Sequence, residues 1–205
     1  MNELGNTITF APERVFFTSD THFCHSRVIA YSERPFANVA EMNEALIHNW
    51  NSVVPKDGIV FHLGDFCFGS KKDWNSILDQ LNGSIHLILG NHDMRESRRD
   101  FMSRFASVQM ERMIEVGDRR ILLNHYPLLC YAQEKYYWQL FGHIHTNPRN
   151  NKILSMERMQ LLMPKQYDVG VDNNNFTPVS FHQVEEIIRY QVETGNRWEQ
   201  TPLNK

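Results

Sequence analysis

The chain has 205 residues, a formal net charge of −3 and an apolar content of 41%. This length and composition suit one domain with a sizeable core, so we expect a single domain over residues 1–205. The near-neutral charge argues against a general binder of nucleic acid or membrane surfaces, and no apolar run approaches the length that crosses a bilayer. Cys24, Cys67 and Cys130 are an odd number at unrelated spacings, which is typical of reduced thiols. With no signal peptide visible in residues 1–12, we expect a cytoplasmic protein.

Apolar runs that predict strands recur along the chain, and most of them end in a short polar cluster. Near-continuous apolar runs of this length are typical of strands buried on both faces. The expected strands lie at 15–17, 59–63, 85–89, 121–123, 138–141 and 167–171. A further segment at 113–116 is expected to pair through the Gly117-Asp118 turn with the strand that begins near Arg119.

Stripes of apolar residues at helical spacing lie between these runs. They predict helices over about 42–53, 74–81 and 184–192, and a fourth over 98–105. We expect Asn82-Gly83 to end the second helix, and Ser180 with Gln183 resembles a capping box that begins the third. Strands that alternate with helices predict a largely parallel, layered α/β arrangement with functional groups beyond the carboxyl ends of the strands. The polar segment at 146–164 is expected to be a long loop or small insertion.

Five short clusters of histidine and acid residues begin where apolar runs end. They are Asp20-Thr21-His22, Gly64-Asp65, Gly90-Asn91-His92-Asp93, Asn124-His125 and Gly142-His143-Ile144-His145. In the first and last clusters two ligand-type residues are two positions apart, so on an extended strand end they point the same way. The seven candidate metal ligands are Asp20, His22, Asp65, Asn91, His125, His143 and His145. Imidazole, carboxylate and amide groups suit divalent ions such as Mn²⁺, Fe²⁺ or Zn²⁺, and no cysteine is needed, which argues against a structural zinc site.

Seven ligands exceed what one tetrahedral ion takes. Two ions roughly 3.5–4 Å apart and bridged by a carboxylate accommodate them. Two divalent cations against the carboxylates of Asp20 and Asp65 leave a net positive centre, which attracts a phosphate. The pattern therefore predicts a site for two divalent metal ions and a phosphate ester. Mn²⁺ is the first candidate, followed by Fe²⁺, Zn²⁺ or Ni²⁺.

The order D-x-H, GD, GNHD, H and GHxH over residues 20–145 resembles the calcineurin-like metallophosphoesterase superfamily. The chain is similar to the small single-domain bacterial or phage members of that superfamily. The resemblance implies a four-layer α/β/β/α sandwich of two mixed sheets flanked by helices, with the dimetal site at the strand ends. Its motifs imply a first metal on Asp20, His22 and His145, a second on Asn91, His125 and His143, and Asp65 as the bridge.

The resemblance also implies a mechanism. A hydroxide shared by the two ions attacks phosphorus in line, and the ions neutralise charge on the phosphoryl oxygens. His92, held in orientation by Asp93, would stabilise that charge or protonate the leaving alkoxide. Asp93 has an alternative role as the N-cap of a following helix. His25, Arg27 and Arg34 are candidates for contact with the substrate phosphate, and an exposed loop position is the alternative for His25.

The expected substrate is a small phosphodiester or phosphomonoester, such as a nucleotide derivative. The stretch 64–70 lacks the arginine of the GDxxDRG motif of phosphoprotein phosphatases, which argues against a Ser/Thr protein phosphatase. Nuclease members usually carry added DNA-binding domains, for which this chain has no room. We expect a metal-dependent hydrolase with no membrane partner. Two alternatives stay open: a non-catalytic metal-binding scaffold on the same fold, and a phosphodiesterase that processes nucleic acid.

Overall fold

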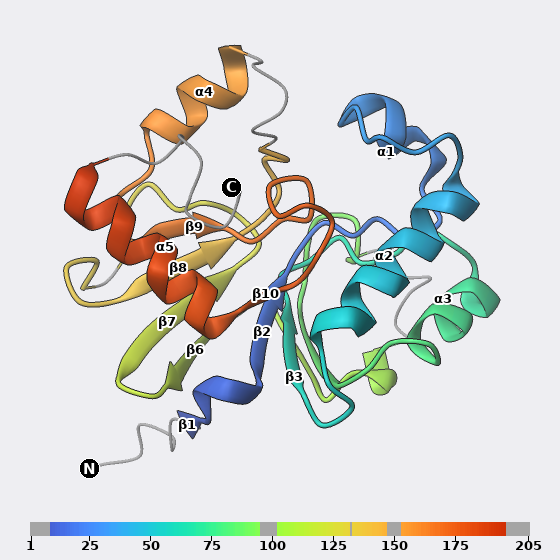
Figure 1. The fold of residues 1–205 in the computed structure, drawn as a ribbon, viewed down its shortest axis with the longest axis horizontal. Coiled ribbons are helices and arrows are strands. Elements are labelled where there is room, and N and C mark those ends of the chain that lie inside the picture. The colour runs from blue at the N-terminus through green and yellow to red at the C-terminus, as the bar shows by residue number, and fades with distance from the viewer. Residues whose placement is uncertain (1–8, 95–101, 132, 147–152, 196–205) are drawn as a thin grey trace.

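The structure is a computed structural model that describes residues 9–94, 102–131, 133–146 and 153–195. Two five-stranded sheets form its centre (Figure 1). In sheet order, the first sheet contains β1 (Thr9–Phe10), β6 (Glu111–Val116), β7 (Arg119–Asn124), β8 (Trp138–Phe141) and β9 (Gln166–Asp168). The second contains β10 (Val179–Ser180), β2 (Val15–Thr18), β3 (Ile59–His62), β4 (Ser84–Ile88) and β5 (Ser107–Gln109).

Both sheets are mixed. In the second sheet β2, β3, β4 and β5 run parallel, and β10 is antiparallel to β2. In the first sheet β7, β8 and β9 run parallel, β6 is antiparallel to β7, and β1 is parallel to β6. The predicted hairpin through Gly117-Asp118 is confirmed, because Val116 pairs with Arg119 across that turn. The parallel strands bring their carboxyl ends to one edge of each sheet, as the alternation of strands and helices predicts.

Helices flank the two sheets. They are α1 (Ser26–Tyr31), α2 (Val39–Val53), α3 (Lys71–Leu78), α4 (Ile153–Gln160), α5 (Phe181–Thr194) and the short 3₁₀ helix η1 (Pro12–Arg14). Among the residues that the structure describes, we find no helix with the length and apolar character that a bilayer span requires.

Alternate residues of β2 and β3 enter two separate cores. In β2, Val15 and Phe17 join the core between the sheets, while Phe16 joins the core beneath α2 and α3. This division follows from the two-residue repeat of a strand, since both faces of β2 are covered. Helix α5 contacts β9 and β10, the edge strands of the two sheets, and its apolar side chains complete the core between them. The expected fold class, two mixed sheets flanked by helices in an α/β arrangement, is confirmed.

The elements differ most from the sequence-based prediction in three places. Helix α3 ends at Leu78, not at Asn82-Gly83. Contacts with α2 explain this, because the Asn82 carbonyl accepts from the Trp50 indole at 2.9 Å and its N–H donates to Asn51 Oδ1 at 2.9 Å. The segment expected as a loop or insertion at 146–164 contains α4. The first half of the helix expected at 98–105 lies outside the described residues, and in its second half 102–104 form a short 3₁₀ turn.

Candidate metal centre

The histidine and acid clusters follow strands of both sheets. The first three clusters follow β2, β3 and β4 of one sheet, and the last two follow β7 and β8 of the other. The loops after β2 and β3 are joined by backbone hydrogen bonds, in which Asp20 N–H donates to Gly64 O at 2.9 Å and His22 N–H donates to Asp65 O at 3.0 Å. The candidate ligands therefore meet where the carboxyl ends of strands from the two sheets come together.

The backbone of these clusters is unusual. Asp20, His22, Asp65, His143 and His145 all have φ between 47° and 70°, the left-handed region that side chains other than glycine rarely adopt. The extended strand end assumed from the sequence is therefore wrong for the first and last clusters. Each such residue costs on the order of 1–3 kcal/mol, and such backbone strain gathers at functional sites.

Two motif glycines allow close approach of the candidate carboxylates. A Cβ added to Gly142 would overlap Asp20 Oδ2 and Ser19 Oγ, and one added to Gly90 would overlap Asp65 Oδ1. Each carboxylate therefore lies directly against a glycine of a neighbouring cluster. This contact gives a physical reason for glycine in both the GNHD and GHxH motifs.

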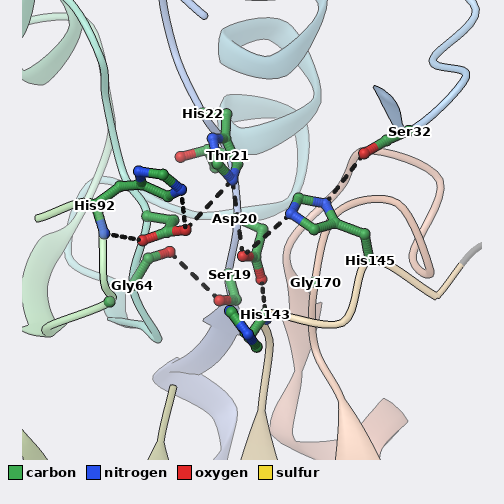
Figure 2. Close-up of polar contacts among 12 residues, drawn as sticks. Ser19, Asp20, Thr21, His22, Ser32, Gly64, His92, His143, His145 and Gly170 are labelled. Carbon is green, nitrogen blue, oxygen red and sulfur yellow. Dashed lines mark hydrogen bonds and ion pairs between the residues drawn. The ribbon is translucent and has the colours of Figure 1, made fainter. Parts of the chain in front are cut away.

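Each of the two carboxylates has one oxygen held by the backbone and one oxygen facing the site. Asp20 Oδ2 accepts from His143 N–H at 2.8 Å, and Asp65 Oδ1 accepts from His92 N–H at 2.9 Å. Asp20 Oδ1 is buried with no hydrogen-bond partner. Figure 2 shows His22, His143 and His145 gathered around Asp20. The second oxygen of each carboxylate is thus free to bind a cation.

Three histidine rings turn the same nitrogen toward these oxygens. His22 Nε2 lies 3.5 Å, and His125 Nε2 3.7 Å, from Asp65 Oδ2. His145 Nε2 lies 3.8 Å from Asp20 Oδ1. The Nδ1 atoms instead contact the protein: that of His125 lies 2.7 Å from Leu63 O, and that of His22 3.2 Å from His25 Nδ1. A metal-bound histidine is commonly oriented in this way by its second nitrogen.

These groups satisfy the requirements of a metal site. Ligand atoms of Asp20, His22 and His145 all lie within 4.8 Å of one another, and so do those of Asp20, Asp65 and His125. His22 Nε2, like Asp20 Oδ1, is buried without a hydrogen-bond partner. A buried polar atom that lacks a partner is costly, and a bound cation would satisfy both atoms at once. The residues present therefore fit divalent metal ions.

The remaining two candidate ligands lie beside these groups. Asn91 Oδ1 is 3.1 Å from His125 Nε2. The ring of His143 packs against the rings of His125 and Tyr126, with centroids 5.0 and 4.7 Å away. The structure thus brings all seven candidate ligands to one region, with Asp65 central and His143 at the exposed margin.

The ionisable side chains of the cluster shift one another's pKa values. Burial lowers the pKa of His22 well below its usual value, and the neighbouring His145 lowers it further. Burial also lowers the pKa of His145, but its hydrogen bond to Asp172 and the Asp20 carboxylate outweigh this and raise it to about 9. Burial raises the pKa of Asp65, as does the nearby Asp20 carboxylate. Two buried carboxylates so close together favour a bound cation.

His92 and Asp93 occupy different places in the site. His92 Nε2 lies 3.9 Å from Asp65 Oδ2, and the ring packs against Phe68 and lines an open cavity. Asp93 is fully buried, and its carboxylate accepts from the N–H groups of Asp65 at 2.6 Å, Gly90 at 2.9 Å and Phe66 at 3.1 Å. The contacts of Asp93 are thus those of a residue that holds the loop after β3 in place.

A cavity of about 670 Å³ opens beside His22, His92 and His145. His25 and Arg27, the candidate substrate residues, line it together with residues of α1. The His25 ring stacks on Phe68 at a centroid distance of 3.8 Å and an angle of 5°. Both candidates therefore lie at the entrance to the candidate metal centre.

Two buried acids of the site lie outside the motifs recognised in the sequence, and a third residue, Arg34, does not lie where it was expected. Asp168 and Asp172, at and beyond the end of β9, are buried in the site. Asp168 accepts from Thr146 Oγ1 and, at 2.8 Å, from Gly170 N–H. Asp172 directly follows the strand predicted at 167–171, which was the available signal, whereas Asp168 lies within that strand, and neither belongs to a histidine motif. Arg34, a candidate for phosphate contact, is 4% exposed and forms an ion pair with Asp172, so that expectation is wrong.

The fold and the site together define an α/β protein with a carboxylate- and histidine-rich candidate metal centre at its strand ends. The chain belongs to the calcineurin-like phosphoesterase superfamily, whose domain model matches residues 14–163. The resemblance of the motifs is thereby confirmed. Membership supports phosphoester hydrolysis in general terms.

Two relatives and one solved structure are similar to this chain. An uncharacterized protein of Methanocaldococcus jannaschii is 35% identical over 179 residues, which are 85% of this chain and 91% of that protein. The gene 66 protein of Mycobacterium phage L5 is 34% identical over 131 residues, 55% of this chain and 62% of that protein. A crystal structure of a protein of unknown function from Aquifex aeolicus has the same fold, with a TM-score of 0.67 and 23% identity over 87% of this chain and 100% of that one.

Proposed function

We propose that this protein hydrolyses phosphoester bonds with two divalent metal ions, of which Mn²⁺ is the first candidate. Asp20, His22 and His145 would hold the first ion, Asn91, His125 and His143 the second, and Asp65 would bridge them. One observation carries the proposal: the Nε2 atoms of His22 and His125, candidate ligands of different ions, lie 3.5 and 3.7 Å from the same Asp65 oxygen, Oδ2. A carboxylate surrounded in this way is suited to bridge two cations.

The residues around this centre have different roles in the proposed reaction. Bound divalent ions supply a water of lowered pKa for in-line attack and neutralise charge on the phosphoryl oxygens. His92 lies at the margin of the cluster, partly exposed and lining the cavity, where a leaving group would sit. We assign to it the proton donated to the leaving alkoxide, or the stabilisation of its charge. Asp93 supports the reaction indirectly, because it holds the N–H groups of the Asp65 loop.

The cavity supports a small anionic substrate. Its lining includes Arg27 and three histidines beside His25, with no acidic side chain among the lining residues. A volume of about 670 Å³ is within the range of sites for small molecules. We therefore propose a small phosphodiester or phosphomonoester, such as a nucleotide derivative, with His25 and Arg27 at its far end.

A hydrolysis assay on metal-free protein tests this proposal. The protein is supplied in turn with Mn²⁺, Fe²⁺, Zn²⁺, Ni²⁺ and Mg²⁺ and offered bis-p-nitrophenyl phosphate and p-nitrophenyl phosphate. We expect turnover that depends on added metal and is lost in Asp65→Asn. Two bound ions without hydrolysis of either ester, or of a panel of nucleotides, would instead favour a non-catalytic scaffold.

The role of His92 has its own test. We expect His92→Ala to retain both metal ions and to lose turnover by about 10²–10⁴-fold, the usual contribution of general acid catalysis. Metal content by atomic emission and kcat for the diester are measured on the same sample. If metal and turnover disappear together, His92 is a ligand and the assignment is wrong.

A further inference from the structure

A buried ion pair lies directly behind the first group of candidate ligands. The side chains of Arg34 and Asp172 are 0% and 1% exposed. Arg34 Nε donates to Asp172 Oδ1 at 2.9 Å, and Nη2 donates to Asp172 Oδ2 at 2.9 Å. This is the two-pronged arrangement that a planar guanidinium makes with a carboxylate. Buried charges are stable only when further hydrogen bonds satisfy them, and both residues form such bonds with groups of the candidate metal centre.

The carboxylate of the pair contacts a candidate ligand. Asp172 Oδ2 lies 2.8 Å from Nδ1 of His145. Ser32 Oγ is a longer contact of the same nitrogen, at 3.3 Å (Figure 2). The other ring nitrogen, Nε2, is thereby turned toward Asp20 Oδ1, 3.8 Å away. The ring is fixed from behind while its free nitrogen faces the site.

The guanidinium of the pair holds the first motif. Arg34 Nη2 donates to the carbonyl of Asp20 at 2.7 Å, and Nη1 donates to the carbonyl of Thr21 at 3.0 Å. These carbonyls belong to the strained segment in which Asp20 has a φ of 55°. One guanidinium thus ties the backbone of Asp20 to the carboxylate that orients His145.

We infer that Arg34 and Asp172 are positioning residues that set the geometry and metal affinity of the first metal site. The inference rests on the proposed function only in placing a metal ion between Asp20, His22 and His145. The pair aligns ligands from two loops that are far apart in sequence. Histidine ligands that donate their second nitrogen to a carboxylate are held in one orientation and bind metal more strongly.

The second site offers an internal reference. His125, a candidate ligand there, directs Nδ1 to the backbone carbonyl of Leu63 at 2.7 Å. That contact does not involve Arg34 or Asp172. A substitution in the pair should therefore lower the affinity of the first site for its metal ion and leave that of the second site unchanged.

Titration of metal-free protein with Mn²⁺ by calorimetry tests the inference. We expect wild type to bind two ions, and Asp172→Asn to weaken one of them by about 10–100-fold, the usual effect of losing such a partner, with the other unchanged. Asp79→Asn is the matched control, because it removes the carboxylate of an exposed arginine pair, Arg104 with Asp79, on the surface. Unchanged affinity for both ions in Asp172→Asn, or equal loss of both, would overturn the inference.

A second variant guards against misfolding. Asp172→Asn leaves the buried guanidinium of Arg34 without its counter-charge, whereas the double variant Arg34→Met with Asp172→Asn removes both charges. We expect the double variant to fold and to show the same selective loss of one ion. If the double variant binds both ions as wild type does, or if both variants fail to fold, the pair has a role other than positioning. Wild-type protein that binds two ions without hydrolysing esters would refute the proposed function and leave this inference standing.

Discussion

Two of the buried histidines, His22 and His62, differ in how their ring nitrogens are used. His22 has its Nε2 buried without a partner, facing the carboxylates. His62 has both nitrogens engaged: Nε2 lies 2.9 Å from Thr21 Oγ1, and Nδ1 accepts from Gly64 N–H at 3.2 Å. Nε2 of His22 is therefore available to a metal ion, and the ring nitrogens of His62 are not. His62 is instead part of the framework beneath the site, as its position within a strand predicts.

The titration of His62 predicts a dependence of stability on pH. Burial lowers its pKa to about 3, and an unfolded histidine titrates near 6.5. Above about 6.5 both states are neutral, so the stabilising contribution is complete. Between pH 6.5 and about 3, His62 is protonated in the unfolded state but stays neutral in the folded state. The free energy of unfolding therefore falls by up to about 1.4 kcal/mol for each pH unit in this range.

Urea denaturation of the metal-free protein at pH 7 and pH 4.5 measures this effect. We expect the free energy of unfolding of His62→Gln to fall less between the two pH values than that of wild type. His182→Gln, on the exposed face of α5, is the matched control and should behave as wild type. An equal fall in His62→Gln and wild type would contradict the assignment.

At the scale of elements, the loops after the strands are organised by contacts between neighbouring clusters. Two buried acids hold these loops through backbone N–H groups. Asp93 does this for the loop after β3, and Asp168 for the residues after β8 and β9. The motif glycines Gly90 and Gly142 let the candidate carboxylates of one loop lie against the backbone of another.

Gly142→Ala tests this packing. An added Cβ would displace Asp20, so we expect the first metal ion to bind at least about 10-fold more weakly, as for other losses of ligand orientation. Calorimetric titration with Mn²⁺ measures the change. Gly195→Ala is the control: its φ of 70° is strained for alanine, yet a Cβ there meets nothing within 4 Å, so Mn²⁺ binding should stay as in wild type. Equal metal binding by Gly142→Ala and wild type would show that Asp20 tolerates the displacement.

For the whole molecule, the candidate metal centre joins the two sheets. Asp20, Asp65 and Asn91 come from one sheet, and His125 and His145 from the other. Since an unfolded chain does not assemble these groups, metal binding should stabilise the association of the sheets. A ligand at 100 times its Kd adds about 2.7 kcal/mol per site to the free energy of unfolding.

Thermal unfolding with Mn²⁺ or with EDTA measures this stabilisation. We expect Mn²⁺ to raise Tm of the wild type by several degrees, since about 1 kcal/mol corresponds to roughly 2–4 °C at this size. Asp65→Asn should lose most of the increase, because it removes the proposed bridge. An increase of the same size in Asp65→Asn would show that Mn²⁺ acts elsewhere on the protein.

Much of the fold followed from local patterns. The main strands, the 111–124 hairpin and the helices α2 and α5 were predicted, because apolar periodicity and turn residues act over a few neighbours. Short elements such as β1, β5, β10 and α1 were not, since two to six residues carry too little pattern. The end of α3 was misplaced because contacts of Asn82 with α2, far away in sequence, decide where the chain leaves the helix.

The amino-acid sequence by itself determined the family and the seven candidate ligands. Metal ligands need carboxylate, imidazole or amide side chains, and these residue types can be recognised in the sequence where strands end. Only the tertiary structure decided which oxygen of Asp65 faces the histidines and that Asp93 holds a loop. It alone also showed that Arg34 and Asp172 meet behind His145. Such pairings join residues 27 to 138 positions apart. Burial, which gives a charged pair its strength, exists only once the chain has folded.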